Sequence, residues 1–409
     1  MFSKFMDSLL YLKREFDISF SVIAAIKTIV IFLIGYSAQK LYDGAHKTIF
    51  NYFKSKGIRK RLRKQEQTFR HNLNILPLGS GSPYDNKKGI YVALSNKSLY
   101  VGFPSDLLGE LKESFNKEDI SDEFVLYSDS SFDNGNSFSD LALSTGIPDL
   151  PELIAKHRNI VARHFIEKTN GCHFNKEKLG VYRIRTHSRH GENELPTVNM
   201  ELFQTDYFTH KVFRSIYKEL MADGHAIADV DTEEELNKYN AFTTSFGVNC
   251  LMILNHGAGV KEYILTKRSR NATEVQSRDQ YNISMLEGLT ITDKNSSDRI
   301  DLSKCVERGF CEELGIENIY IYDSTIKFYD VFLEKNHFEL GITCAVETSR
   351  LSFEELLQKA EFAKDRTLEI SDILRIDNDR REVEAFIHAN EFKQQAQFTL
   401  QRLVAREDL

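Results

Sequence analysis

The sequence predicts a mixed α/β (α+β) protein with an N-terminal membrane helix, an α/β middle domain and a C-terminal α/β/α sandwich. Residues 18–38 are almost entirely apolar, and residues 87–240 mix alternating and helical patterns. Residues 245–409 place a strand hairpin before a capped helix and further strands after it. At 409 residues with 41% hydrophobic content, the chain is long enough for two soluble domains and an appendage.

The N-terminal part divides into three predicted segments. Residues 1–17 have apolar side chains at helical spacing and predict an amphipathic segment. Residues 18–38 are long enough, at about 1.5 Å per residue, to cross a hydrocarbon core of about 30 Å. Lys27 interrupts this stretch at a cost of about 2.5–3.5 kcal/mol, which the surrounding apolar residues outweigh. A buried helix of a soluble protein and a cleaved signal peptide are the alternatives.

The charge distribution supports attachment to a membrane surface. Residues 1–70 hold 14 Lys and Arg against 5 Asp and Glu, whereas the remainder holds 39 against 55. Residues 39–75 predict a basic juxtamembrane helix, and the positive-inside rule puts everything after it in the cytoplasm. No DNA or RNA duplex is expected as a partner, since the body of the chain is acidic. The five cysteines show no metal-binding spacing and predict reduced thiols.

The middle domain is predicted at residues 87–240, after a Pro/Gly/Ser-rich linker at 76–86. Its predicted elements are strands at 90–94 and 99–103 forming a hairpin, and helices at 151–168 and 201–220. His157 and His164 lie seven residues apart on the first helix. A metal site is one interpretation of this pair, and core or edge histidines are the favoured one.

A strand predicted at residues 180–190 carries a row of basic side chains. Alternate residues share a strand face, which places Val181 with four basic residues, namely Arg183, Arg185, His187 and Arg189. Such a row in an acidic body predicts a binding surface for an oligophosphate. A solvated face paired with acidic neighbours is the favoured alternative.

The C-terminal domain is predicted at residues 245–409. Its predicted strands are 248–254, 261–266, 283–286, 319–323, 325–333 and 338–347, and its predicted helices are 302–314, 353–363, 383–389 and 392–405. Asp301 is the expected N-cap of the first helix. Three bases follow the second strand, where they meet phosphates or simply end the strand, namely Lys267, Arg268 and Arg270.

Residues 308–316 resemble the end of a Nudix box, G-x5-E-x7-R-E-U-x-E-E-x-G-U, where U is a bulky aliphatic residue. The matching residues are Arg308, Phe310, Glu312, Glu313, Gly315 and Ile316. Gly309 stands where the family has a glutamate, and the stretch from Gly288 to Arg308 is six residues too long. The resemblance implies a Nudix-like sandwich in which Glu312 and Glu313 bind Mg²⁺ and, with Arg308, form the catalytic site. A substitute carboxylate would come from Glu287, Asp301, Glu307 or the insertion 293–298.

The order of these parts resembles membrane-bound Nudix effectors of bacterial cyclic-oligonucleotide anti-phage systems. That resemblance implies a single-pass protein of the inner membrane whose cytoplasmic part binds a nucleotide or cyclic oligonucleotide. It also implies a homo-oligomer that acts on the lipid bilayer. Two other functions stay open. One is a membrane-anchored, Mg²⁺-dependent Nudix pyrophosphohydrolase of a nucleoside diphosphate derivative, and the other is an adaptor.

Overall fold

The computed structural model describes part of the chain, and the predicted N-terminal segments lie mostly outside it. The described residues are 56–58, 60–62, 64–65, 72–78, 89–115, 124–167, 174–187, 197–272, 275–364 and 366–407. The predicted segments 1–17 and 18–38 are not among them, nor is most of 39–75. No helix within the described ranges is long and apolar enough to cross a membrane. The chain divides into two units, Met1–Ile58 and Arg59–Leu409.

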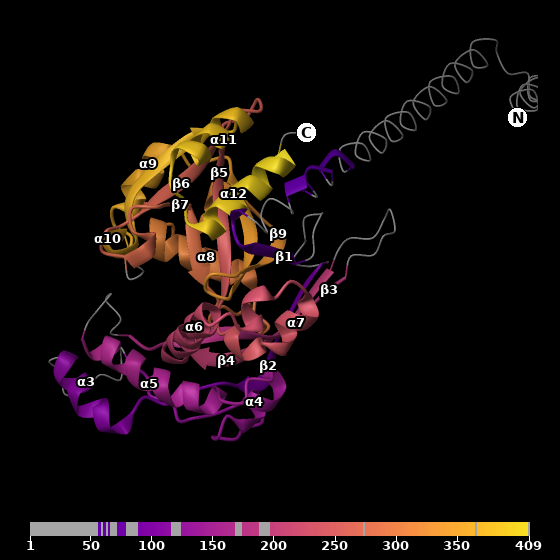
Figure 1. The fold of residues 1–409 in the computed structure, drawn as a ribbon. Coiled ribbons are helices and arrows are strands. Elements are labelled where there is room, and N and C mark those ends of the chain that lie inside the picture. Colours follow the sequence, from indigo (N-terminus) through magenta and orange to yellow (C-terminus); the bar gives the residue numbers. More distant parts are fainter. Residues whose placement is uncertain are drawn as a thin grey trace, which may run out of the picture. The chain divides into compact units, whose positions relative to one another are not determined.

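Two sheets with flanking helices make up the second unit (Figure 1). The larger sheet has the strand order β1-β9-β10-β5-β6-β11, with β7 paired to β6 and β8 paired to β5. Its strands are β1 (Ile75–Leu78), β5 (Phe246–Asn255), β6 (Lys261–Arg268), β7 (Tyr281–Ile283), β8 (Met285–Gly288), β9 (Thr325–Glu334), β10 (Glu339–Thr348) and β11 (Ile370–Asp377). The smaller sheet has the order β2-β4-β3, with β2 (Ile90–Ser98), β3 (Glu177–His187) and β4 (Thr197–Asp206).

The helices fall into two groups along the chain. Those of the middle region are α3 (Leu108–Phe115), α4 (Ser139–Thr145), α5 (Leu150–Ile166), α6 (Tyr207–Ala222) and α7 (Glu233–Lys238). Those of the C-terminal region are α8 (Leu302–Leu314), α9 (Phe353–Ala360), α10 (Arg366–Glu369), α11 (Arg380–Ala389) and α12 (Gln394–Glu407). The short 3-10 turns are η1 (Ser105–Leu107), η3 (Ala226–Asp229), η4 (Asn240–Phe242), η5 (Val275–Ser277) and η6 (Ile319–Tyr322).

The larger sheet is buried on both faces because alternate residues of β5 enter different cores. Cys250 and Met252 join a core that contains the apolar side of α8. Leu251 and Ile253 join a second core, formed with α11 and α12. Since side chains alternate across a strand, the nearly continuous apolar run of β5 is what a doubly covered strand requires. The mixed α/β class with helices on both faces of the sheet is therefore confirmed.

The predicted hairpin at 90–103 is wrong. β2 continues without a turn through Ser98 and pairs in parallel with β4. Leu99 and Val101 are buried because the chain beyond β2 packs on the helical layer, where the Val101 amide donates to Thr209 Oγ1 over 2.8 Å. The alternation that suggested a second strand therefore reflects burial, and the segment forms only an isolated bridge between Tyr100 and Ser130 instead of a hairpin with β2.

The predicted helix at 201–220 is also wrong over its first turns. β4 extends to Asp206, whose side chain accepts from the Thr209 amide at 2.7 Å and caps α6. Asp206 therefore ends the strand and begins the helix. In the C-terminal region, residues 319–322 form a 3-10 turn capped by Asn318 where a strand was predicted. The strand β11 was not predicted at all.

Residues 75–78 form β1, where the sequence predicts the end of the basic helix and the start of the linker. This strand pairs antiparallel with β9, opposite residues 331–334. Nearby, Arg402 is fully buried on α12 and donates to the Leu62 carbonyl over 3.2 Å. Arg402 and Arg406 both pair with buried Asp330 of β9. The chain around Leu62 and the strand β1 are therefore attached to the C-terminal region.

Candidate functional site

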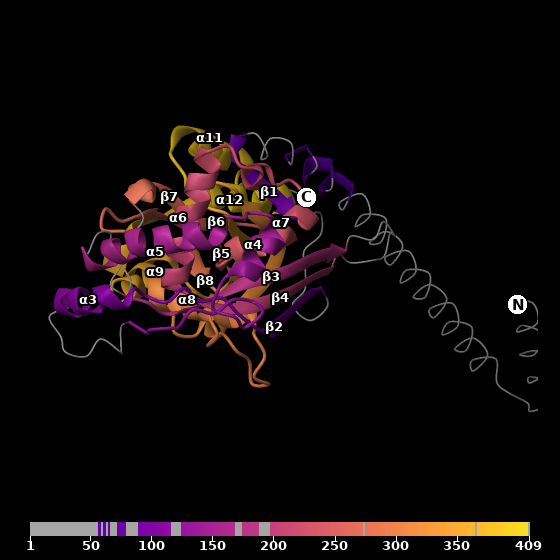
Figure 2. The same ribbon diagram turned by 60° about the horizontal axis from the view of Figure 1, so that its bottom comes forward.

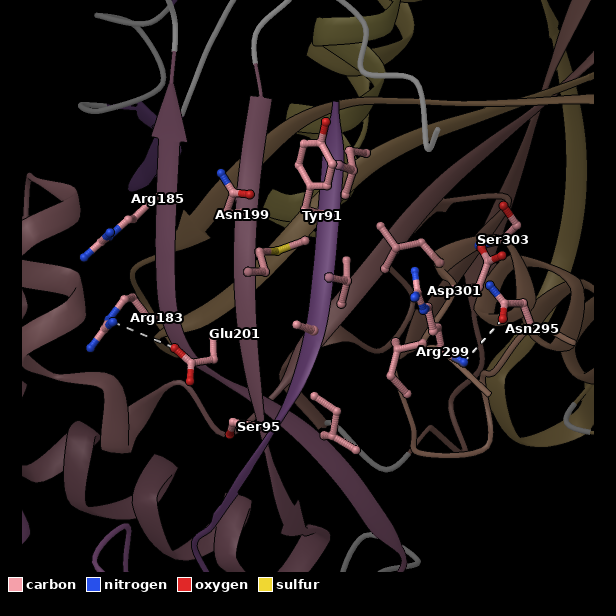
Figure 3. A pocket seen from close by; sticks show the side chains of 17 residues that line it. Tyr91, Ser95, Arg183, Arg185, Asn199, Glu201, Asn295, Arg299, Asp301 and Ser303 are labelled. Carbon is pink, nitrogen blue, oxygen red and sulfur yellow. Dashed lines mark hydrogen bonds and ion pairs between the residues drawn. The ribbon is translucent and has the colours of Figure 1, made fainter. Parts of the chain in front are cut away.

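A groove of about 920 Å³ lies along the smaller sheet (Figure 3), whose strands β2, β3 and β4 are drawn as ribbons in Figure 2. One wall consists of β2, β4 and β3, and the other consists of residues 295–303, which lead into α8. The lining residues are Ile90, Tyr91, Val92, Ala93, Leu94, Ser95, Arg183, Arg185, Asn199, Met200, Glu201, Asn295, Arg299, Ile300, Asp301, Leu302 and Ser303. The groove is therefore lined both by the predicted basic strand and by the insertion that precedes α8.

The sheet wall is built from two cross-strand rows of side chains. Arg185 lies opposite Asn199, which lies opposite Tyr91, and Arg183 lies opposite Glu201. The register of β3 shifts between Val181 and Arg183, which is the mark of a β-bulge. Because of this bulge, the two arginines are exposed while Val181 is buried. Val181 was predicted on the same face, and that prediction is wrong.

The basic row is only partly neutralised. Arg183 lies 3.9 Å from the Glu201 carboxylate, and both side chains are well exposed, so this ion pair is weak. Arg185 makes no ion pair with a carboxylate of the described residues, and the same holds for Arg299 on the opposite wall. Figure 3 shows these two arginines on different sides of the strands. The favoured alternative was that acidic neighbours pair with the bases of this strand. Of the two arginines that line the groove on this strand, it holds for Arg183 and not for Arg185.

The remaining predicted bases have other positions. His187 is exposed on the same strand, opposite Thr197, but does not line the groove. Arg189 lies outside the described residues. The three bases after β6 also lie elsewhere. Arg268 pairs with Glu369, Arg270 pairs with Asp279 at 3.1 Å, and Lys267 lies over the Tyr281 ring.

The insertion before α8 is an ordered hairpin, residues 293–301. The Asp301 amide donates to the Asp293 carbonyl over 2.8 Å, and the Asn295 amide donates to the Arg299 carbonyl over 2.9 Å. The side chain of Asp301 then accepts from the Ser303 amide and caps α8, as predicted. The excess length that departs from the Nudix pattern therefore forms one wall of the groove. The sequence showed that this stretch is longer than the Nudix pattern, but it did not predict that the stretch forms a hairpin.

Arg308 uses its guanidinium to join three elements. Its Nε and Nη2 donate to the two Asp293 oxygens, both over 2.9 Å. Nη1 lies 2.8 Å from Glu287 and 3.2 Å from Glu312, and Nη2 also donates to the Gly288 carbonyl over 2.7 Å. Burial alone would lower the pKa of Arg308, but the bonds from Asp293 and the charge of Glu287 raise it instead. The substitute partners of Arg308 are therefore Asp293 and Glu287.

Gly309 is explained by the packing of α8 on β8. A Cβ at this position would lie 2.6 Å from Met285 Sδ and 2.9 Å from Glu287 Cβ. Both distances are below any normal carbon contact, so the helix and strand approach too closely for a side chain. The glutamate of the Nudix pattern has no room in this structure.

Glu312 and Glu313 have different surroundings. Glu312 pairs with Arg308 and lies 3.4 Å from Lys364. Glu313 is buried and accepts from the Leu286 amide at 3.2 Å. Burial, together with the charges of Glu287 and Glu369, raises the pKa of Glu313 well above its usual range. Across the described residues, no group of three or more His, Cys, Asp or Glu side chains is arranged to hold a metal ion.

The histidine pair also has a structural explanation. His157 Nδ1 lies 2.8 Å from Ser215 Oγ, and its Nε2 lies 3.1 Å from Glu219. It is buried between α5 and α6. His157 therefore joins these two helices, which agrees with the favoured structural interpretation.

No protein-family model matches the sequence, and no curated protein matches it either.

Proposed function

We propose that the groove between the smaller sheet and the hairpin 293–301 binds a nucleotide-type anion, and that the chain is a receptor for such a signal. The observation that carries the proposal is the pair Arg185 and Arg299. These two guanidinium groups line one groove from opposite walls, and neither is neutralised by a described carboxylate. Planar guanidinium groups suit phosphate oxygens because they donate two parallel hydrogen bonds.

The other lining residues suit the non-phosphate parts of a nucleotide. Tyr91 lines the groove and is 52% exposed, and an aromatic ring is the kind of side chain on which a base stacks. Asn199 lies between Tyr91 and Arg185 in the same cross-strand row and presents an amide that both donates and accepts. Arg183 and Arg185 lie about 7 Å apart along their strand, since two residues rise by that amount. That repeat favours a ligand with more than one phosphate, such as a cyclic oligonucleotide.

The proposal extends to the whole chain through its N-terminal sequence. Residues 18–38 would cross the inner membrane once, with the groove in the cytoplasm, and binding would promote oligomerisation and membrane disruption in anti-phage defence. The apolar length of this segment and the basic residues after it support that arrangement. A C-terminal region related to Nudix proteins is part of the same proposal, supported by the box helix, its Asp301 cap and its left-handed Gly315.

Pyrophosphate hydrolysis has less support from the same site. Mg²⁺ prefers several free carboxylate oxygens together with substrate phosphates and water. Here Glu287, Asp293 and Glu312 all contact the guanidinium of Arg308, and Glu313 is buried with a raised pKa. A cation would have to compete with Arg308 for the same oxygens. We therefore favour binding over turnover, and Mg²⁺ would enter only with a phosphate ligand.

The test is binding and turnover by the purified full-length chain. ATP, ADP-ribose, cyclic di-AMP and cyclic tri-AMP are titrated by calorimetry, and each is then incubated with Mg²⁺ and analysed for products. We expect at least one compound to bind without being consumed. Arg185→Ala should weaken that binding about tenfold or more, since a charge-assisted hydrogen bond contributes about 1.5–3 kcal/mol.

The matched control is Arg380→Ala, which removes an arginine that pairs with Glu384 on α11. Its affinity should equal that of the unaltered chain. Turnover that is lost in Glu312→Gln or Glu313→Gln would overturn the receptor proposal in favour of the hydrolase. Absence of binding to all four compounds would leave the groove without a nucleotide role and favour an adaptor.

A further inference from the structure

We infer that Arg308 and Asp293 are positioning residues that hold the hairpin 293–301, so that Arg299 forms the second wall of the groove. The inference rests on the proposed function for its ligand, and on the contacts of the hairpin for its mechanism. It gives Arg308 a role different from orienting a metal-binding glutamate. Neither residue lines the groove itself.

Asp293 is the fixed base of the hairpin. Its side chain is 2% exposed and accepts two hydrogen bonds from Arg308 and one from the Thr290 amide at 2.9 Å. Its carbonyl accepts from the Asp301 amide at the other end of the hairpin. A buried carboxylate without these donors would cost several kcal/mol, so Asp293 is held where the donors are.

Arg308 connects this base to rigid elements. It extends from α8, whose apolar side is buried against the larger sheet. Its other contacts, with Glu287 and the Gly288 carbonyl, are at the end of β8. The guanidinium therefore fixes the hairpin relative to one helix and one strand at once. A lysine in its place would keep the charge and lose the planar set of donors.

Arg299 lies at the turn, beyond this fixed base. Its amide donates to Asn295 Oδ1 over 3.3 Å, whereas its side chain has no ion pair with a described carboxylate. An arginine on a mobile loop would lose conformational entropy when it binds a phosphate. Because the hairpin is held at its base, part of that conformational entropy is already lost in the protein without ligand. Arg308 and Asp293 would then contribute to affinity through Arg299, and the coupling can be measured.

The first test needs no ligand. Amide hydrogen exchange of the full-length chain is compared with that of Arg308→Lys and Asp293→Asn. We expect faster exchange at the Asn295 and Asp301 amides, with unchanged exchange in β5 and β10. Lys304→Ala is the control, because the Lys304 side chain pairs with Glu307, one turn later on the same helix. Unchanged exchange in the hairpin, or equal acceleration throughout the sheet, would overturn the positioning role.

The second test is a double-mutant cycle with cyclic tri-AMP as the probe. Arg299→Ala and Asp293→Asn should each weaken binding about tenfold, and the double variant should be little weaker than either one, because both remove the same contribution. Arg185→Ala should add its full effect to Asp293→Asn. Additivity between Asp293→Asn and Arg299→Ala would refute the coupling. Faster hairpin exchange with no binding of the probe or its relatives would refute the proposed function and leave the positioning role standing.

Discussion

Gly309 provides the sharpest test of how the box helix packs. Replacing it with alanine has two opposed effects on the free energy of unfolding. Alanine is favoured over glycine within a helix by about 1 kcal/mol. The added Cβ would lie 2.6 Å from Met285 Sδ and 2.9 Å from Glu287 Cβ, and overpacking of this kind costs about 1–3 kcal/mol. We therefore expect Gly309→Ala to lose up to about 2 kcal/mol.

Gly309→Glu introduces the glutamate of the Nudix pattern, and it should lower the free energy of unfolding more than Gly309→Ala does. It adds a carboxylate next to Glu287, whose pKa is already raised by burial despite the opposing charge of Arg308. An uncompensated buried charge costs about 3–5 kcal/mol. This variant should unfold at a lower urea concentration and should not hydrolyse ADP-ribose with Mg²⁺. The chain contains no tryptophan, so unfolding is followed by circular dichroism.

The matched control is Gly109→Ala in α3, where the added Cβ would meet no atom within 4 Å. That variant should be stabilised by up to about 1 kcal/mol, since only the helix preference changes. If Gly309→Ala raises the free energy of unfolding as much as Gly109→Ala does, then α8 and β8 do not approach each other as closely as described. If Gly309→Glu folds normally and acquires hydrolysis, the argument that the pattern has no room here is also wrong.

Two further predictions concern the pH dependence of stability. Burial tends to raise the pKa of Asp330, but the charges of Arg402 and Arg406 lower it to about 2. Its contribution to stability is therefore full above the unfolded value of about 3.9 and is lost as the pH falls from there towards 2. Asp330→Asn should remove this acid sensitivity and cost about 3–5 kcal/mol at pH 7 by removing the buried negative charge with which both arginines pair, as urea titrations at several pH values would measure. The contribution of Glu313 changes with pH in the opposite direction, because its raised pKa means that folding favours the protonated form. Stability should fall as the pH rises above about 4.3, and Glu313→Gln should flatten that decline. An unchanged slope in either variant would contradict the assigned charge state.

Much of the C-terminal region was predictable because its signals are local. The bounds of α8 follow from the Asp301 cap, the apolar spacing of Leu302, Val306 and Phe310, and the left-handed Gly315. The strands β5, β6, β9 and β10 were located because apolar runs between turns mark buried strands. The pairing of Arg308 with Glu312 also followed from helical spacing, and the structure gives it at 3.2 Å.

The errors occurred where local pattern and tertiary packing disagree. Residues 99–103 alternate like a strand because they face a helical layer. Residues 201–206 were assigned to a helix, but they extend β4 because they pair with β3, and α6 begins only after Asp206. β1 and β11 are the edge strands in the order of the larger sheet, and their pairing partners β9 and β6 lie far away in sequence. No window of sequence contains such a partner.

The sequence by itself determined the mixed α/β class, the box helix and the basic residues Arg183 and Arg185 on one strand face, because helical period, capping and strand alternation act between near neighbours. Tertiary structure alone decided that these arginines share a groove with Arg299, since that depends on how β3 and the hairpin approach each other. It also decided the roles of Gly309 and Arg308. Side chains of β8 fill the space beside Gly309. Arg308 pairs with Glu287 of β8 and with Asp293, which lies in a hairpin whose shape depends on contacts across the fold.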